Sequence, residues 1–244
     1  MDVRMDPLGQ EYVRIPCGTY RVGNDSPAAH PNESPSRIVQ ISEELWISQR
    51  PVLQSIWSAV MESNPSRFSE GFEAGLRPVE RIDWMEANDF GDKLSRHLND
   101  LEGWHIEGEF RLPSEAEWEI AARAGTVEEW YCGNQDREIH QYVWNAGNSG
   151  GTSQAVGQKP ANPWGLHDIC GNVAEWCLDS WHENMQGAPI DASPWLSGGD
   201  SGRRVHRGGS WFTESEATRC SSRSSAPVDR KSDGIGMRLL WQAL

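Results

Sequence analysis

The stretch GLHDICGNVAEWC, residues 165–177, is the part of the chain around which we expect the fold to be organised. It places a tight Gly-Asn turn between two carboxylates, Asp168 and Glu175, and it contains Trp176, a side chain too large to leave in water. Gly171 can adopt backbone conformations that other residues avoid. The two acids, seven positions apart, can therefore converge on the inside of the loop.

This convergence is compatible with two structures. Carboxylate oxygens completed by main-chain carbonyls, here those of Gly171 and Val173, form the oxygen-only ligand set that calcium prefers. The same acids could instead cap backbone N–H groups of a buried turn, with Trp176 in the core. The spacing alone leaves the calcium site and the buried turn as open alternatives.

Length and composition predict one domain over residues 1–244, without a membrane-spanning segment. No linker, repeat or low-complexity run divides the chain, and 244 residues can bury a sizeable core. Thirteen Trp with 24 Gly and 14 Pro indicate extensive ordered loops packed on aromatic side chains. The first ten residues lack the apolar core of a secretory signal, so a cytoplasmic location is expected unless a leader has been removed.

The net charge limits the classes of binding partner, and the cysteine spacing indicates the redox state of the thiols. A formal net charge of −14 argues against nucleic acid and anionic membranes, which are bound by clustered Lys and Arg. The five cysteines show neither CxxC nor zinc spacing, so we expect reduced and mostly buried thiols. One disulfide stays possible in an oxidising compartment.

Local patterns predict strands and helices in the first half of the chain. Ser114 and Glu117 form a capping box that starts a short helix over residues 115–124, with Trp118 facing inward. Beyond Thr126 the periodicity fades into loop until two strands near the end of the chain. The other expected elements are strands within 12–22, at 37–41, 45–47, 204–211 and 235–241, a helix from Pro51 ended by Asn64-Pro65, and a helix with the face Phe90, Leu94 and Leu98.

Four blocks of sequence resemble the signatures of the formylglycine-generating enzyme family, also called sulfatase-modifying factors. They are RLPSEAEWEIAARAGT at 111–126, NPWGLHDICGNVAEW at 162–176, RVHRGGSW at 204–211 and DGIGMRL at 233–239. The resemblance covers nearly the whole chain in the family's order. It implies an α+β, C-type-lectin-like single domain with two main helices, a small mixed sheet and extensive ordered loop.

The resemblance also bears on catalysis. The family's enzymes oxidise a substrate cysteine to formylglycine with a copper ion held by two cysteines that follow the RGG-S-aromatic block. Here that segment, residues 212–225, contains only Cys220. Two thiolates are what hold a soft Cu(I) ion, so copper is not expected and a non-catalytic protein is favoured. The alternative is a metal-dependent oxidoreductase of the formylglycine-generating type that acts on a cysteine or thiol substrate.

The family's calcium loop resembles GLHDICGNVAEW, and this similarity favours a structural calcium ion over the bare turn. It implies side-chain ligands from Asp168 and Glu175 and carbonyl ligands from Gly171 and Val173. Ala174 replaces an aromatic residue of the family pattern without changing these ligand types.

A second likeness is to the variable proteins of diversity-generating retroelements, which display a changeable binding surface between an RGGSW strand and a terminal IGFRL strand. The equivalent segment here is 212–233, so we expect it to bind a protein or peptide ligand.

His206, just before it, is expected to face solvent or to neighbour a cap. Arg219, Arg223 and Arg230 could form a carboxylate-binding patch or pair locally with Glu214, Glu216 and Asp229. The expected contact residues are Trp211, Phe212, Thr213, Glu214, Glu216, Arg219, Ser221, Ser222, Arg223, Ser225 and Arg230.

Overall fold

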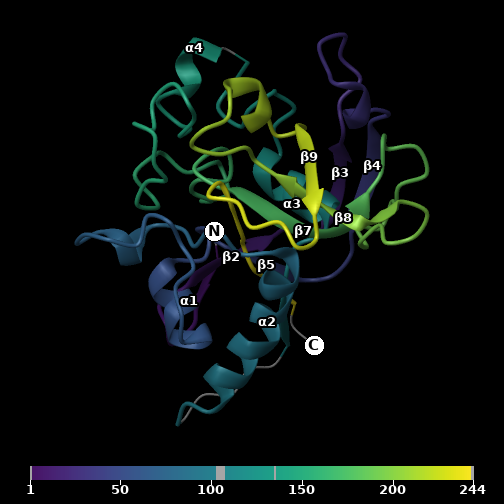
Figure 1. The fold of residues 1–244 in the computed structure, drawn as a ribbon. Coiled ribbons are helices and arrows are strands. Elements are labelled where there is room, and N and C mark those ends of the chain that lie inside the picture. Colours follow the sequence, from purple (N-terminus) through teal and green to yellow (C-terminus); the bar gives the residue numbers. More distant parts are fainter. Residues whose placement is uncertain (1, 103–107, 135, 243–244) are drawn as a thin grey trace.

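A five-stranded antiparallel sheet brings the two ends of the chain together. The computed structural model describes residues 2–102, 108–134 and 136–242 (Figure 1). The C-terminal strand lies between two strands from the first half of the chain, and Leu240 is paired with Ile47 on one side and Arg111 on the other. In spatial order the strands are β1 (Val3–Met5), β2 (Glu11–Ile15), β5 (Leu45–Ser48), β11 (Leu240–Gln242) and β6 (Glu109–Arg111).

A second, four-stranded sheet is mixed and contains strands within and just after residues 212–233. Its order is β10 (Ile235–Gly236), β7 (Ala174–Trp181), β8 (Asp200–Arg207) and β9 (Arg223–Pro227). The β10 and β7 strands are parallel, whereas β7, β8 and β9 are antiparallel. A separate hairpin pairs β3 (Gly18–Val22) with β4 (Arg37–Ile41).

Three helices of two or more turns accompany the sheets in the described part of the chain. They are α1 (Gln54–Met61), α2 (Trp84–Asn99) and α3 (Glu115–Arg123), and the fold is α+β as the family resemblance implies. Capping boxes start both α2, at Asp83, and α3, at Ser114. Every residue of α3 is buried, because the helix packs among β3, β7 and β8. The remaining helical turns are η1 (Pro31–Glu33), η2 (Ala74–Leu76), α4 (Asp136–Ile139) and η3 (Ser215–Thr218).

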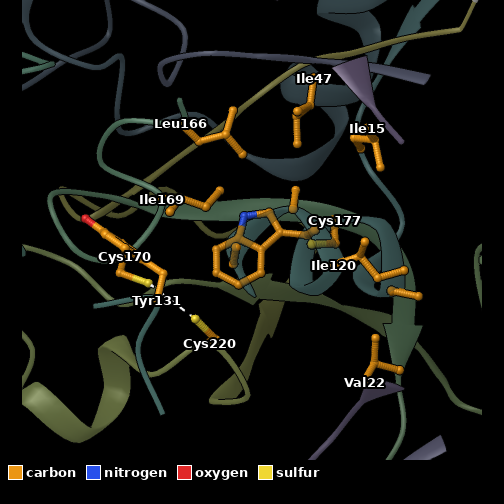
Figure 2. Close-up of a cluster of buried hydrophobic side chains, with 14 of the residues drawn as sticks. Ile15, Val22, Ile47, Ile120, Tyr131, Leu166, Ile169, Cys170, Cys177 and Cys220 are labelled. Carbon is orange, nitrogen blue, oxygen red and sulfur yellow. Dashed lines mark hydrogen bonds between the residues drawn. The ribbon is translucent and has the colours of Figure 1, made fainter. Parts of the chain in front are cut away.

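Tryptophan rings fill two adjoining hydrophobic clusters, as the composition indicated. In one cluster Trp57 stacks on Phe90 with ring centroids 5.0 Å apart. In the other, shown in part in Figure 2, aliphatic side chains surround Trp118 and three buried cysteines. The indole N–H groups of Trp118 and Trp176 donate to Glu175 and to the Ile82 carbonyl, so these buried rings leave no polar atom unpaired.

Several predicted boundaries are wrong for identifiable reasons. The strand expected over 204–211 ends at Arg207, because Gly208 and Gly209 take positive φ values of 94° and 65°. The strand expected over 235–241 divides into β10 and β11, which belong to different sheets. The helix α1 ends at Met61, and the left-handed Glu62 rather than Asn64-Pro65 terminates it. Strand β7 was not predicted at all.

No helix among the described residues is long and apolar enough to span a bilayer.

Replacing Gly91 by Ala should destabilise the protein, although alanine is the better helix former. A Cβ at this α2 position would lie 2.1 Å from the Phe110 carbonyl oxygen, so α2 would have to move away from β6. Overpacking of this kind costs about 1–3 kcal/mol, to be measured by urea unfolding. Gly75→Ala is the matched control, because its Cβ would meet only ordinary contact at 3.5 Å. Equal stabilities of the two variants would refute the packing argument.

Candidate functional site

A buried network of ion pairs lies beneath the segment expected to bind. Arg207, at the end of β8, donates to Glu115 and Glu119 of α3, both at 2.7 Å. Arg223, at the start of β9, donates to both oxygens of Glu115 at 2.6 and 2.8 Å. Burial alone would raise the pKa of Glu115, but the guanidinium groups of Arg223 and Arg207 lower it to about 2. Two strands are thereby held on one helix by fully ionised groups.

A second network fixes the middle of the segment to the N-terminal part of the chain. Arg219 donates to both oxygens of Glu33 at 2.5 and 2.8 Å and to Glu129 at 3.0 Å. It also donates to the Ser221 hydroxyl, which lies within hydrogen-bonding distance of Asn24. Neither sequence hypothesis for the arginines named these partners. Three expected contact residues, Arg219, Ser221 and Arg223, therefore direct their polar atoms into the fold.

The other expected contact residues differ in exposure. Phe212, Glu214, Glu216 and Arg230 are exposed, whereas Trp211, Thr213, Ser222 and Ser225 are half-buried. Trp211 donates its indole N–H to the Asp233 carbonyl and contacts the edge of Phe212, with ring centroids 4.8 Å apart. An open groove of about 970 Å³ runs between 28–33, 129–134 and 214–223, and Glu214 and Glu216 line it.

His206 does not face open solvent as expected. It is half-buried in β8, and its ring meets the Trp176 indole edge-on with centroids 5.6 Å apart. Burial lowers the pKa of His206 to about 4, so the imidazole is neutral at pH 7.

The loop expected to hold calcium is built as a tight buried turn. Gly171 has φ 83°, and a Cβ there would lie 2.3 Å from the Trp144 carbonyl oxygen. Glu175 is 0% exposed and accepts hydrogen bonds from Arg238 at 3.0 and 3.1 Å and from Trp118 at 2.7 Å. Asp168 is 2% exposed and accepts one from the Gly157 N–H at 2.7 Å.

The charges in this loop do not balance. Arg238 neutralises Glu175, but Asp168 makes no ion pair within the described residues. Burial raises the pKa of both carboxyls, and Asp168 raises that of Glu175 further. No group of three or more His, Cys, Asp or Glu in the described ranges is arranged to hold a metal ion. A cation here would therefore depend on main-chain oxygens, such as those of Gly171 and Val173, beside the two acids.

Two buried thiols, which the sequence gave no reason to connect, lie close together in the core. The sulfurs of Cys170 and Cys220 are 4.0 Å apart, both buried in the cluster of Figure 2. The contact with Cys220 and burial together raise the pKa of Cys170 well above its ordinary value, so this thiol is protonated. Fifty residues separate the two cysteines, and no metal-ligand spacing could have identified the pair.

Comparison with known proteins supports the resemblance seen in the sequence. Residues 3–243 match the model of the Sulfatase-modifying factor enzyme 1-like domain. The chain therefore belongs to the formylglycine-generating enzyme, or sulfatase-modifying factor, family.

Individual relatives and one solved structure place it more closely. The chain is 33% identical to the mouse Formylglycine-generating enzyme over 277 residues, covering 93% of this chain and 73% of that protein. It is 30% identical to Chaperone protein LppX of Paenibacillus barcinonensis over 212 residues, 70% of each. Treponema denticola variable protein 1 superposes with a TM-score of 0.87 at 29% identity, covering 99% of this chain and 98% of that one. The chain spans only 21% of a Chlamydia caviae serine/threonine-protein kinase, pkn1, that it also matches.

Replacing Glu115 by Gln should lower the free energy of unfolding at pH 7 by about 3–5 kcal/mol, because it leaves two buried guanidinium groups short of a counter-charge. The wild-type carboxylate has a folded-state pKa below its ordinary 4.5, so its stabilisation is complete above pH 4.5 and is lost as the pH falls towards 2.

Urea unfolding at several pH values measures both effects. The variant should lack the part of the acid dependence that comes from this carboxylate. Glu70→Gln, at an exposed position, is the control and should unfold like the wild type. A loss below about 1 kcal/mol for Glu115→Gln, the range of exposed ion pairs, would show that the network is not needed.

Proposed function

We propose that this protein is a non-catalytic scaffold that presents the 212–233 segment to a protein or peptide partner. The observation that carries the proposal is that some side chains of the segment are fixed inside the fold while others point outward. Arg219 and Arg223 are fixed inside by buried acids, while Phe212, Glu214 and Glu216 point outward. A surface that is ordered before binding loses little conformational entropy when it binds.

The chemistry of this face suits a partner with apolar and basic groups. Phe212 is 48% exposed and rests on the edge of Trp211, and aromatic residues of this kind are frequent anchors of interfaces. Glu214 and Glu216 form no ion pair with described residues and line the wide groove beside it. With a net charge of −14, the whole protein attracts positively charged partners.

A calcium ion at the 168–175 loop would brace the same face. Asp168 and Glu175, with the carbonyls of Gly171 and Val173, would hold it, and the ion would neutralise the charge that Arg238 leaves over. The loop supports the face directly, since the Asn172 carbonyl accepts a 2.8 Å hydrogen bond from the Trp211 N–H. The calcium ion would be structural and would take no part in a reaction.

One observation favours a second candidate, a thiol oxidoreductase. Cys170 and Cys220 lie close enough for shared redox or metal chemistry, but both are enclosed in the core and out of reach of a substrate thiol. Stoichiometric copper in protein purified without chelator, together with aldehyde formation on a cysteine peptide, would support this candidate over the scaffold.

The binding face can be tested with a phage-displayed library of peptides encoded by the genome of the organism that produces the protein. Binders selected on the wild type should lose at least about tenfold in affinity for Phe212→Ala/Glu214→Gln/Glu216→Gln, because anchor truncation commonly costs 1.4 kcal/mol or more. The control Phe72→Ala/Glu70→Gln/Glu73→Gln makes the same three changes at exposed positions elsewhere. Binders that do not distinguish the two variants would contradict the proposed face.

Calcium should raise the melting temperature by a few degrees at saturating concentration, because it binds only the folded loop. Without the ion, the raised pKa of Asp168 means that its protonated carboxyl contributes fully to the free energy of unfolding below pH 3.8. This contribution is lost as the pH rises through the folded-state pKa, and bound calcium should prevent the loss of stability.

Scanning calorimetry with calcium and with EDTA measures the difference. Asp168→Asn should remove the response, and Asp229→Asn, at an exposed position, should keep it. Identical wild-type melting in calcium and in EDTA at pH 8 would eliminate the brace.

A further inference from the structure

A cavity of about 390 Å³ opens next to Phe212 and adjoins the groove lined by Glu214 and Glu216. The turn after β8, strand β9 and the residues before β10 surround it. Most of its walls are small side chains or bare backbone, which is why it is hollow. The small lining residues are Ala174, Gly208, Gly209, Ala217, Ala226 and Gly234. Its volume falls within the range of about 300–1,000 Å³ typical of ligand sites.

An unsatisfied hydroxyl lines this cavity. Ser210 is 1% exposed, yet its Oγ has no hydrogen-bond partner in the described part of the chain. A Cβ built on Gly234 would lie 2.9 Å from this oxygen and 2.3 Å from the Phe212 ring, so hydroxyl and ring converge on the same spot. A buried hydroxyl without a protein partner is disfavoured in a folded protein, so the Ser210 hydroxyl is available to a ligand that supplies the missing hydrogen bond.

The second polar group is His206. Its ring forms no hydrogen bond with any described residue and meets the Trp176 indole edge-on. Because burial lowers the pKa of His206 to about 4, the neutral ring offers one donor and one acceptor nitrogen at pH 7. Arg223 and Arg230 also line the cavity; Glu115 neutralises Arg223, and Arg230 is exposed. The Ser210 hydroxyl and the neutral His206 ring therefore favour an uncharged group that both donates and accepts a hydrogen bond.

Among protein side chains, tyrosine meets these requirements. Its ring is apolar enough for walls of Gly, Ala and Phe, and its hydroxyl both donates and accepts. Tryptophan offers only a donor, phenylalanine offers neither, and asparagine and glutamine lack the apolar body. We propose that this cavity anchors a tyrosine side chain of the protein partner, with the phenol hydroxyl bonded to Ser210 and His206. This inference rests on the proposed function.

Small phenols test the cavity without knowledge of the partner. p-Cresol, the side-chain analogue of tyrosine, should bind the full-length protein saturably, with shifts in the NMR signals of Ser210 and His206. Toluene has nearly the same shape without the hydroxyl and should bind at least about tenfold more weakly, because a site built to hydrogen-bond rejects the analogue that cannot. N-acetyl-tyrosine amide and N-acetyl-phenylalanine amide should show the same order.

Two variants distinguish the hydrogen bond to the ligand from the volume that the cavity offers. Ser210→Ala should reduce the preference for p-cresol over toluene to less than about threefold, by weakening p-cresol binding and by sparing toluene the cost of an unpaired hydroxyl. Ala226→Leu fills the cavity and should weaken both ligands. The matched controls are Ser55→Ala and Ala59→Leu, at exposed positions of α1, and should change neither affinity. Calorimetric melting of each variant establishes that it is folded.

The outcomes distinguish this inference from the proposed function. Equal wild-type affinities for p-cresol and toluene, or no saturable binding, would overturn the tyrosine anchor. A library binder that depends on Phe212 but ignores p-cresol and Ala226→Leu would also overturn it, while the scaffold function would stand. Competition between p-cresol and such a binder, weakened in Ser210→Ala, would support both. A phenol site without any face-dependent binder would remove the scaffold function and the anchor together.

Discussion

The buried carboxylate of Glu115, shared between Arg207 and Arg223, is the interaction on which the candidate site depends. It joins the first turn of α3 to the end of β8 and the start of β9. These two strand ends enclose the segment from 208 to 222. A charge removed from water is tolerated only with partners of good geometry, so the helix and both strands must be in place together. The segment that follows β8 is thereby coupled to the centre of the fold.

Order in the long irregular regions has a related origin. Gly208 and Gly209 turn the chain away from β8 with backbone angles that other residues disfavour, and a Cβ on Gly208 would lie 2.9 Å from the Ile169 carbonyl oxygen. The 165–177 loop and the turn after β8 therefore pack backbone against backbone. Hydrogen bonds between them, such as that from the Gly171 N–H to the Gly208 carbonyl, replace the missing ladder of a sheet.

This construction separates, within one short segment, the side chains that stabilise the fold from those that face outward. The side chains that hold it, Arg219 and Arg223, are paired with buried acids from distant parts of the chain, while Phe212 and the two glutamates can change without disturbing those contacts. One fold can support different functions, because function depends on the residues of a site and not on the frame alone. Membership of the family accordingly defines the frame, and under the proposed function the outward residues would decide what it recognises.

The sequence determined the elements that depend on near neighbours, and the family blocks indicated the fold. The Ser114 capping box, the α2 face through Phe90 and the strands β3 and β4 follow from local spacing and were predicted, whereas the pairing of these two strands was not. Strand β7 was missed because it is buried on both faces and lacks the alternation that reveals a half-exposed strand. The bonds of Arg219 to Glu33, 186 positions away, and the contact of Cys170 with Cys220 were decided only by tertiary structure. Many acids and thiols were equally available in the sequence, and only the folded backbone selects which of them meet.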